Sequence, residues 1–291
     1  MCGHVRALKS LVSLPALLTA LIGFTLLVAG PLRPYEATWH RYWARGFPDP
    51  VPWVLQQVLD RITGQAVCLP VLLAVAVVIA RRRRTWRPLF VVAAAEAAFF
   101  GGVGLMKLVL ARPAPVMQDA RFFAGGLFED GWHGISYPSG HTSEAILIYG
   151  AAVYLIFRYC RPSATVRRRL VIAVGIIAVN SVATAYLLGW HWATDLPAGL
   201  LTGGVLLHVV IWVDRHLIAR LVPAPGTETD ATTTDPPPET NGPPAGTTGT
   251  FGAPNTGAAP EGRPVGTSPD SVSPDPGDLE HGELRADPHP Q

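Results

Sequence analysis

The feature of this sequence that most constrains its fold is a series of six long apolar segments separated by short polar stretches. Each has close to the ~20 residues that a helix needs to cross the hydrocarbon core of a bilayer. Because lipid offers the backbone no hydrogen-bond partner, a segment in that environment must form a helix. The sequence therefore predicts an all-α fold, a six-span transmembrane helical bundle. The predicted spans are 11–29, 62–80, 88–110, 142–160, 170–188 and 192–213.

The first apolar segment also has features of a secretory signal peptide. Arg6 and Lys9 precede it, and the small residues Ala29 and Gly30 follow its apolar core. Signal peptides have apolar cores of about 7–15 residues, and this segment is longer. We therefore interpret it as an uncleaved span. Both interpretations place the segment that follows on the outer side of the membrane.

Basic residues near the span ends predict the orientation, because positively charged loops stay in the cytoplasm. Arginine runs at 81–84 and 167–169 join the second span to the third and the fourth to the fifth. Further basic residues flank the first and last spans. All these clusters fall on the same side of a six-span chain. We therefore expect a multi-pass protein of the cell membrane with both termini in the cytoplasm.

The loops at 30–61 and 111–141 then face outward. The first of them carries Arg33, Arg41 and Arg45, which weakens the charge bias without reversing it. Its Trp and Tyr residues suggest a helix that lies in the membrane interface.

The C-terminal residues have a different composition. From residue 223 onward there are eleven acidic residues against two arginines, and Pro, Gly and Thr are abundant. A segment with so few large apolar residues cannot bury a core, so we expect it to be disordered. The sequence thus divides into a six-helix domain at 1–221 and a disordered cytoplasmic tail at 222–291. The acidic tail could serve as a docking segment for a cytoplasmic partner.

Three polar clusters lie at the predicted outer ends of the spans. KLVLARPAP contains Lys107, YPSGHTS at 137–143 opens the fourth span, and TAYLLGWHWATD at 184–195 joins the fifth to the sixth. Taken singly, Lys107 could extend to the lipid headgroups, the PSG turn could only cap a helix, and His191 could be an interfacial histidine. Ionisable groups at this depth are costly and usually functional. Their joint occurrence on one face therefore favours a site.

The first two clusters contain residues that are expected to bind an anion. Ser139 and Gly140 form a turn that opens a helix, where backbone N–H groups and the positive helix end can meet a phosphate. Lys107 adds a positive charge. We therefore expect these three residues to bind phosphate.

The third cluster supplies a reacting group. Asp195 follows His191 by four residues, so on one helical face its carboxylate can orient the imidazole and leave the other nitrogen free to attack. His141 is then placed to protonate the leaving oxygen as general acid. This chemistry needs no metal ion, and the three cysteines show no metal-ligand spacing. We expect no cofactor.

These motifs resemble the type 2 phosphatidic acid phosphatase family, within the vanadium haloperoxidase-like superfamily. The family pattern is K-x-x-x-x-x-x-R-P, then P-S-G-H, then S-R-x-x-x-x-x-H-x-x-x-D, and the resemblance is closest over residues 60–213. It implies a helical-bundle enzyme that removes phosphate from lipid phosphates or diphosphates at the outer face, through a phosphohistidine. It also implies that Lys107, Ser139 and Gly140 contact phosphate, that His141 is the general acid, and that His191 is the nucleophile with Asp195 as its partner.

Two positions depart from the family pattern, because Ala114 and Ala185 stand where the family has arginine. Arg112 is the nearest substitute, and we expect it to bind phosphate. On a continuous helix residue 112 would point about 140° away from Lys107. Because Pro113 ends the helix, the loop can still bring Arg112 to the site. Loss of one positioned donor typically lowers a rate about 100- to 1000-fold.

The sequence thus predicts an integral membrane phosphatase that acts on a lipid phosphate or polyprenyl diphosphate at the extracytoplasmic face. The alternative, suggested by the two alanines and the tail, is a weakened or inactive member that binds a lipid phosphate or a membrane partner. A transporter fits less well, because transporter sites usually lie near the midplane. We expect the bilayer and a lipid phosphate as partners, and no nucleic acid.

Overall fold

The computed structural model describes residues 13–218 and 220. The predicted tail and the basic residues before the first span lie outside the described residues. Within the described ranges every regular element is helical, and five helical segments are long and apolar enough to cross a membrane. A sixth span results if Leu14–Ala29 is counted with Arg33–Gly46, to which it is bent by 64°. The predicted all-α, multi-span bundle is confirmed.

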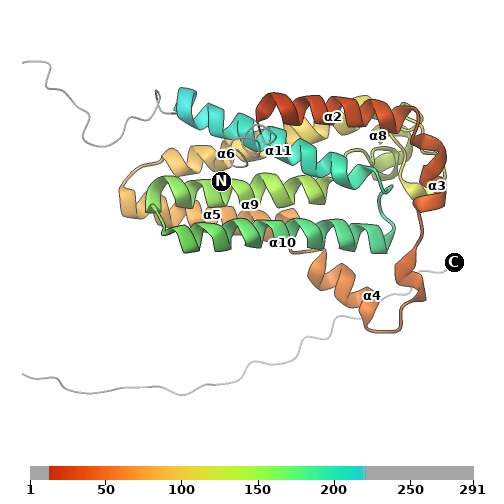
Figure 1. Cartoon of the computed structure of the whole chain (residues 1–291), viewed down its shortest axis with the longest axis horizontal. Coiled ribbons are helices and arrows are strands. Elements are labelled where there is room, and N and C mark those ends of the chain that lie inside the picture. The colour runs from red at the N-terminus through yellow and green to blue at the C-terminus, as the bar shows by residue number, and fades with distance from the viewer. Residues whose placement is uncertain (1–12, 219, 221–291) are drawn as a thin grey trace, which may run out of the picture. The chain divides into compact units, whose positions relative to one another are not determined.

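The long helices run alongside one another in Figure 1. The bundle consists of α2 (Leu14–Ala29), α5 (Gln65–Arg83), α6 (Arg87–Ala98), α9 (Gly140–Cys160), α10 (Ala164–Leu188) and α11 (Asp195–Val213). These helices agree with the predicted spans to within six residues at each end, once α6 is counted together with the segments that continue it to Leu110.

The third predicted span is a composite. Helix α6 continues through a π-helical segment, η4 (Phe99–Gly104), into the short helix α7 (Leu105–Leu110). The π segment reads FFGGVG, and a Cβ at Gly102 would lie 2.6 Å from a methyl carbon of Leu206 on α11. Glycine here allows the two helices to approach closely. Lys107 therefore lies in the final helical stretch of this span.

Helix α9 is the centre of the bundle. It contacts α5, α6, α10 and α11, and more than half of its apolar window is buried, against a third or less in the other spans. Figure 1 shows α9 between α10 and the α6 and α11 pair. A helix surrounded in this way holds its N-terminal residues in a fixed position, which matters because α9 begins in the PSGH motif.

The start of α9 packs closely against α11 through two glycines spaced by four. A Cβ at Gly199 would lie 1.9 Å from the Thr142 hydroxyl, and one at Gly203 would lie 2.6 Å from the Ser143 carbonyl oxygen. Small residues at this spacing let helix backbones meet in membranes. The contact fixes the second polar cluster relative to the third.

Helix α11 begins at Asp195, three residues later than the predicted start of the sixth span. His191 therefore lies in the turn that precedes α11, and the expectation that His191 and Asp195 share one helical face is wrong. The physical reason is local, because the Asp195 carboxylate accepts a hydrogen bond from the backbone N–H of Trp192 at 3.1 Å. A carboxylate in the first turn also interacts favourably with the positive end of the helix.

The first connecting loop contains short helices in place of the single interfacial helix that was expected. Its Trp and Tyr side chains are spread over these pieces, and Tyr35, Trp39, Trp43 and Trp53 are exposed. The pieces are η1 (Arg33–Tyr35), α3 (Glu36–Trp39), η2 (Trp43–Gly46), α4 (Val51–Val54) and η3 (Leu55–Leu59).

Candidate active site

A cavity of about 620 Å³ opens at the end of the bundle where α9 and α11 begin. It is lined by residues from all three polar clusters, and we call it the site cavity. The predicted site residues on its wall are Lys107, Gly140, His141 and His191. The fold thus brings residues of the three clusters to one cavity.

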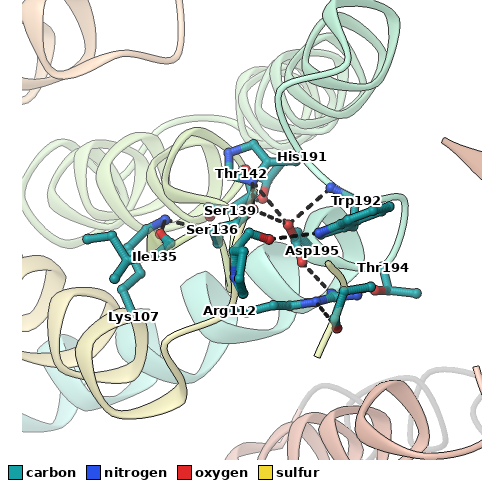
Figure 2. A network of polar contacts seen from close by, with 12 residues as sticks. Lys107, Arg112, Ile135, Ser136, Ser139, Thr142, His191, Trp192, Thr194 and Asp195 are labelled. Carbon is teal, nitrogen blue, oxygen red and sulfur yellow. Dashed lines mark hydrogen bonds and ion pairs between the residues drawn. The ribbon is translucent and has the colours of Figure 1, made fainter. Parts of the chain in front are cut away.

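His191 is held from behind by two side chains. Its Nδ1 lies 3.3 Å from Oδ2 of Asp195 and 3.1 Å from the Ser136 hydroxyl, which itself donates to the same carboxylate oxygen at 2.5 Å. Figure 2 shows the three residues drawn together by these contacts. Nε2 of His191 makes no hydrogen bond to any described residue. The ring thus presents its free nitrogen while the other is fixed.

Burial favours the neutral form of this histidine. It lowers the pKa of His191 below its ordinary value, and this effect outweighs the neighbouring Asp195 carboxylate, which raises that pKa. A neutral imidazole with one fixed nitrogen is the form that can act as a nucleophile.

Asp195 is fully buried and engaged at both oxygens. Oδ1 accepts from Nη1 of Arg112 at 2.6 Å, and Oδ2 accepts from Ser136 and from the backbone of Trp192. A buried carboxylate is stable only when such donors surround it. The arrangement keeps the carboxylate oriented towards His191.

Arg112 lies behind the site cavity and not on its wall. Its guanidinium is fully buried and donates to Asp195, to the Thr194 hydroxyl at 3.0 Å and to Glu36 at 2.8 Å, while Nε donates to the Ala120 carbonyl at 3.1 Å. Figure 2 shows the guanidinium beside Thr194 and the Asp195 carboxylate. The geometry thus gives Arg112 a carboxylate partner where the sequence predicted a phosphate.

Lys107 brings a positive charge to the wall of the site cavity. Its ammonium donates to the carbonyl oxygens of Ile135 at 2.8 Å and Ser136 at 3.0 Å. A lysine has three donor hydrogens, so one remains for a ligand. The Lys107 ammonium is therefore held against the backbone of Ser136, whose hydroxyl contacts His191.

The PSGH turn joins the site through its backbone. The Ser139 N–H donates to the Asp195 carbonyl at 3.1 Å, and Gly140 lines the site cavity as the first residue of α9. The Ser139 side chain is buried, and its hydroxyl has no partner among the described residues. Phosphate binding by Ser139 and Gly140 stays a prediction.

His141 faces the site cavity with an acidic partner that the sequence did not suggest. Its Nε2 lies 3.4 Å from Oδ2 of Asp60, which follows η3. Asp60 is a lone acid between two apolar stretches, and no motif marks it. Ser136 was missed for a similar reason, although it directly precedes the conspicuous YPSGH run.

The two alanines occupy different environments. Both are buried, but Ala114 lines the site cavity, whereas Ala185 on α10 does not. Among residues 13–218 and 220, no three His, Cys, Asp or Glu side chains are placed to hold a metal ion.

These features define a multi-pass helical membrane protein in which a buried His–Asp pair, a lysine and a second histidine surround one cavity. Residues 84–218 match the model of the PAP2 superfamily, a region that contains Lys107, His141, His191 and Asp195.

Two relatives from Bacillus subtilis accompany this match. Phosphatidylglycerophosphatase B of strain 168 is 25% identical over 177 residues, which cover 57% of this chain and 78% of the relative. The crystal structure of a transmembrane PAP2 type phosphatidylglycerolphosphate phosphatase superposes with a TM-score of 0.55 and 20% identity. The superposition covers 68% of this chain and 96% of that chain, and it shows a common fold.

Proposed function

We propose that this protein is a membrane phosphatase that hydrolyses a lipid phosphate or lipid diphosphate through a phosphohistidine at His191. The observation that carries the proposal is the geometry of His191, whose Nδ1 is held by Asp195 and Ser136 while the ring lines the site cavity. Asp195 stabilises the positive charge that develops on the ring during attack.

In the first step, Nε2 of His191 forms a bond to phosphorus as the bond to the leaving oxygen breaks. The leaving oxygen takes the proton of His141, whose ring lies beside the Asp60 carboxylate. In the second step, water gives a proton to His141 and its oxygen attacks phosphorus. The N–P bond breaks, inorganic phosphate leaves, and His191 is regenerated.

The cavity walls favour a lipid over a small soluble phosphate. Phe99, Val116, Trp132 and Trp190 line the site cavity beside the polar groups. An apolar wall next to an anion site suits a headgroup with a hydrocarbon chain attached. Phosphatidylglycerol phosphate, phosphatidic acid and polyprenyl diphosphates meet this requirement, and the name of the Bacillus relative supports the first. The basic clusters at the opposite span ends support an extracytoplasmic site.

The test is phosphate release from these three lipids by the purified full chain in detergent. Release is expected from at least one of them, with accumulation of an acid-labile phosphoenzyme. His191→Ala should lower the rate on the order of 10⁴-fold or more, as loss of a nucleophile does elsewhere. His208→Ala is the matched control, because Nδ1 of His208 on α11 donates to the Gly204 carbonyl of the same helix, and His208 does not line the site cavity.

Ala114 and Ala185 favour the second candidate, a member that binds a lipid phosphate without turnover. It predicts saturable binding of the same lipids with no phosphate release by the wild type. That outcome would exclude the phosphatase and retain the site as a binding site.

A further inference from the structure

The site cavity has fewer strong cations than its chemistry calls for. A phosphate carries a charge of about −1.5 to −2 near neutral pH. Lys107 already donates to two carbonyl oxygens, and Arg112 is engaged by Glu36 and Asp195. Position 114 faces the site cavity with a methyl group. The predicted site residues thus provide one ammonium and no guanidinium.

Arg45, from a segment that none of the motifs contains, also lines the site cavity. It lies in η2 of the first connecting loop, and it makes no ion pair with another residue of 13–218 or 220. Its guanidinium carbon lies 4.3 Å from the centre of the Tyr42 ring, and Tyr42 lines the cavity too. Stacking on an aromatic face leaves the N–H groups at the edge of a guanidinium available.

The end of α10 fixes the segment that carries Arg45. Gly189 has a φ of +69°, and a Cβ there would lie 2.6 Å from the Tyr42 ring. Ala44 packs with Leu188 in a small apolar cluster, one residue before Arg45. Glycine at 189 thus meets two requirements at once, a left-handed backbone and space for the Tyr42 ring.

A second anchor ties the same segment to the reacting pair. Glu36 accepts from Nη2 of Arg112 at 2.8 Å and from the Thr194 hydroxyl, and all three side chains are buried. The Tyr186 hydroxyl donates to the Trp39 carbonyl at 2.9 Å. Residues 36–46 are therefore attached both to the Asp195 network and to α10, so Arg45 has a defined place at the cavity.

We infer that Arg45 binds the phosphate group that His191 attacks and supplies the guanidinium contact that positions 114 and 185 lack. The inference rests on the proposed function. A guanidinium can donate two parallel hydrogen bonds to phosphate oxygens and carries a positive charge. The alanine side chains at 114 and 185 can do neither. Arg112 meanwhile acts as a positioning residue for Asp195.

The test compares Arg45→Ala, Arg45→Lys and Arg41→Ala in the full chain. Arg41 is the matched control, because it is an exposed arginine of the same segment that stacks on Trp43 and does not line the site cavity. Arg45→Ala should lower kcat/KM about 100-fold, as removal of a positioned donor does. It should also raise the inhibition constant of inorganic phosphate, and Arg45→Lys should retain part of both. Arg41→Ala should match the wild type.

A rescue variant separates loss of charge from loss of fold. Because residue 114 lines the same cavity, Ala114→Arg in the Arg45→Ala background should recover much of the lost kcat/KM. Wild-type values for Arg45→Ala would overturn the inference while leaving the phosphatase standing. So would a fall in kcat/KM with an unchanged inhibition constant for phosphate, since Arg45 would then contact another part of the lipid. If the wild type releases no phosphate, the proposed function fails, and phosphate affinity measured by calorimetry still decides whether Arg45 binds the anion.

Discussion

Helix α11 has a buried aspartate at each end, and the two serve different purposes. Asp195 is its first residue, and Asp214 directly follows its last. Both are fully buried. Asp214 is surrounded by groups that hold it in place, with Nε of Arg87 at 2.7 Å, the Tyr154 hydroxyl at 2.5 Å and Nε of Arg158 at 3.3 Å. This cluster joins α6, α9 and the end of α11.

Asp195 also pairs with an arginine, Arg112, through Oδ1. Its other oxygen contacts His191, a side chain that can gain or lose a proton and can act as a nucleophile. His191 lies at 3.3 Å from Oδ2 and lines the site cavity, whereas none of the partners of Asp214 named above lines that cavity. A buried, ion-paired carboxylate is thus by itself only a structural feature. It becomes part of a site when one of its partners is a histidine that faces open space.

The sharpest test of this comparison is the pair Asp195→Asn and Asp214→Asn. Asp195→Asn should lower kcat on the order of 10⁴-fold, because an amide cannot hold the imidazole in the same tautomer or stabilise its positive charge. Asp214→Asn should leave kcat of the folded protein near that of the wild type. The measurement of kcat is the rate of phosphate release per folded molecule at saturating substrate.

Thermal unfolding in detergent provides the control for both variants. Each replaces a buried carboxylate that pairs with arginine, so each should lower the Tm. Equal losses of kcat in the two variants would remove the distinction between the two ends of α11.

Ser136→Ala should have a smaller effect. The Ser136 hydroxyl contacts both Asp195 and His191, and a hydrogen bond to a charged group contributes about 1.5–3 kcal/mol. The variant should therefore lower kcat/KM about 10- to 100-fold. Ser181→Ala is the matched control, because the buried Ser181 hydroxyl on α10 has no partner among the described residues. A Ser136→Ala protein as active as Ser181→Ala would show that the aspartate alone orients the ring.

The pH dependence should show the smallest effect. His191 must be neutral to attack, and burial lowers its pKa below the ordinary value of 6.5. As pH falls, kcat/KM should therefore stay level through 6.5 and decline only at lower pH. The lipid phosphate itself titrates near ~6, and its own ionisation is measured by phosphorus NMR and divided out. An acidic decline centred above 6.5 would mean that Asp195 outweighs burial.

Much of the fold and part of the site follow from local sequence. Hydropathy over ~20 residues locates the spans because crossing a bilayer imposes that length on any helix. Lys107, His141 and His191 were predicted as site residues because their motifs combine unusual residues with a fixed spacing, and all three line the site cavity. The helix start before Asp195 was misplaced, because Trp192 and Ala193 are as apolar as the helix that follows.

The partners of these residues could not be read from spacing. Arg112 and Glu36 are 76 positions apart, and Ser136 and His191 are 55 apart. Nothing near Glu36, Arg45 or Asp60 marks them as companions of a distant histidine. Buried charges need donors within hydrogen-bond distance wherever these come from in the chain.

Hydropathy and motif spacing are properties of single segments, so they were enough to predict a bundle of membrane-spanning helices with Lys, Ser, His and Asp at one end. The folded chain fixes what each charge does, because the partners of these charges are distant in the sequence. It turned Arg112 inward to Asp195 and Glu36, because a buried carboxylate requires a cation, and it brought Arg45 to the wall of the site cavity.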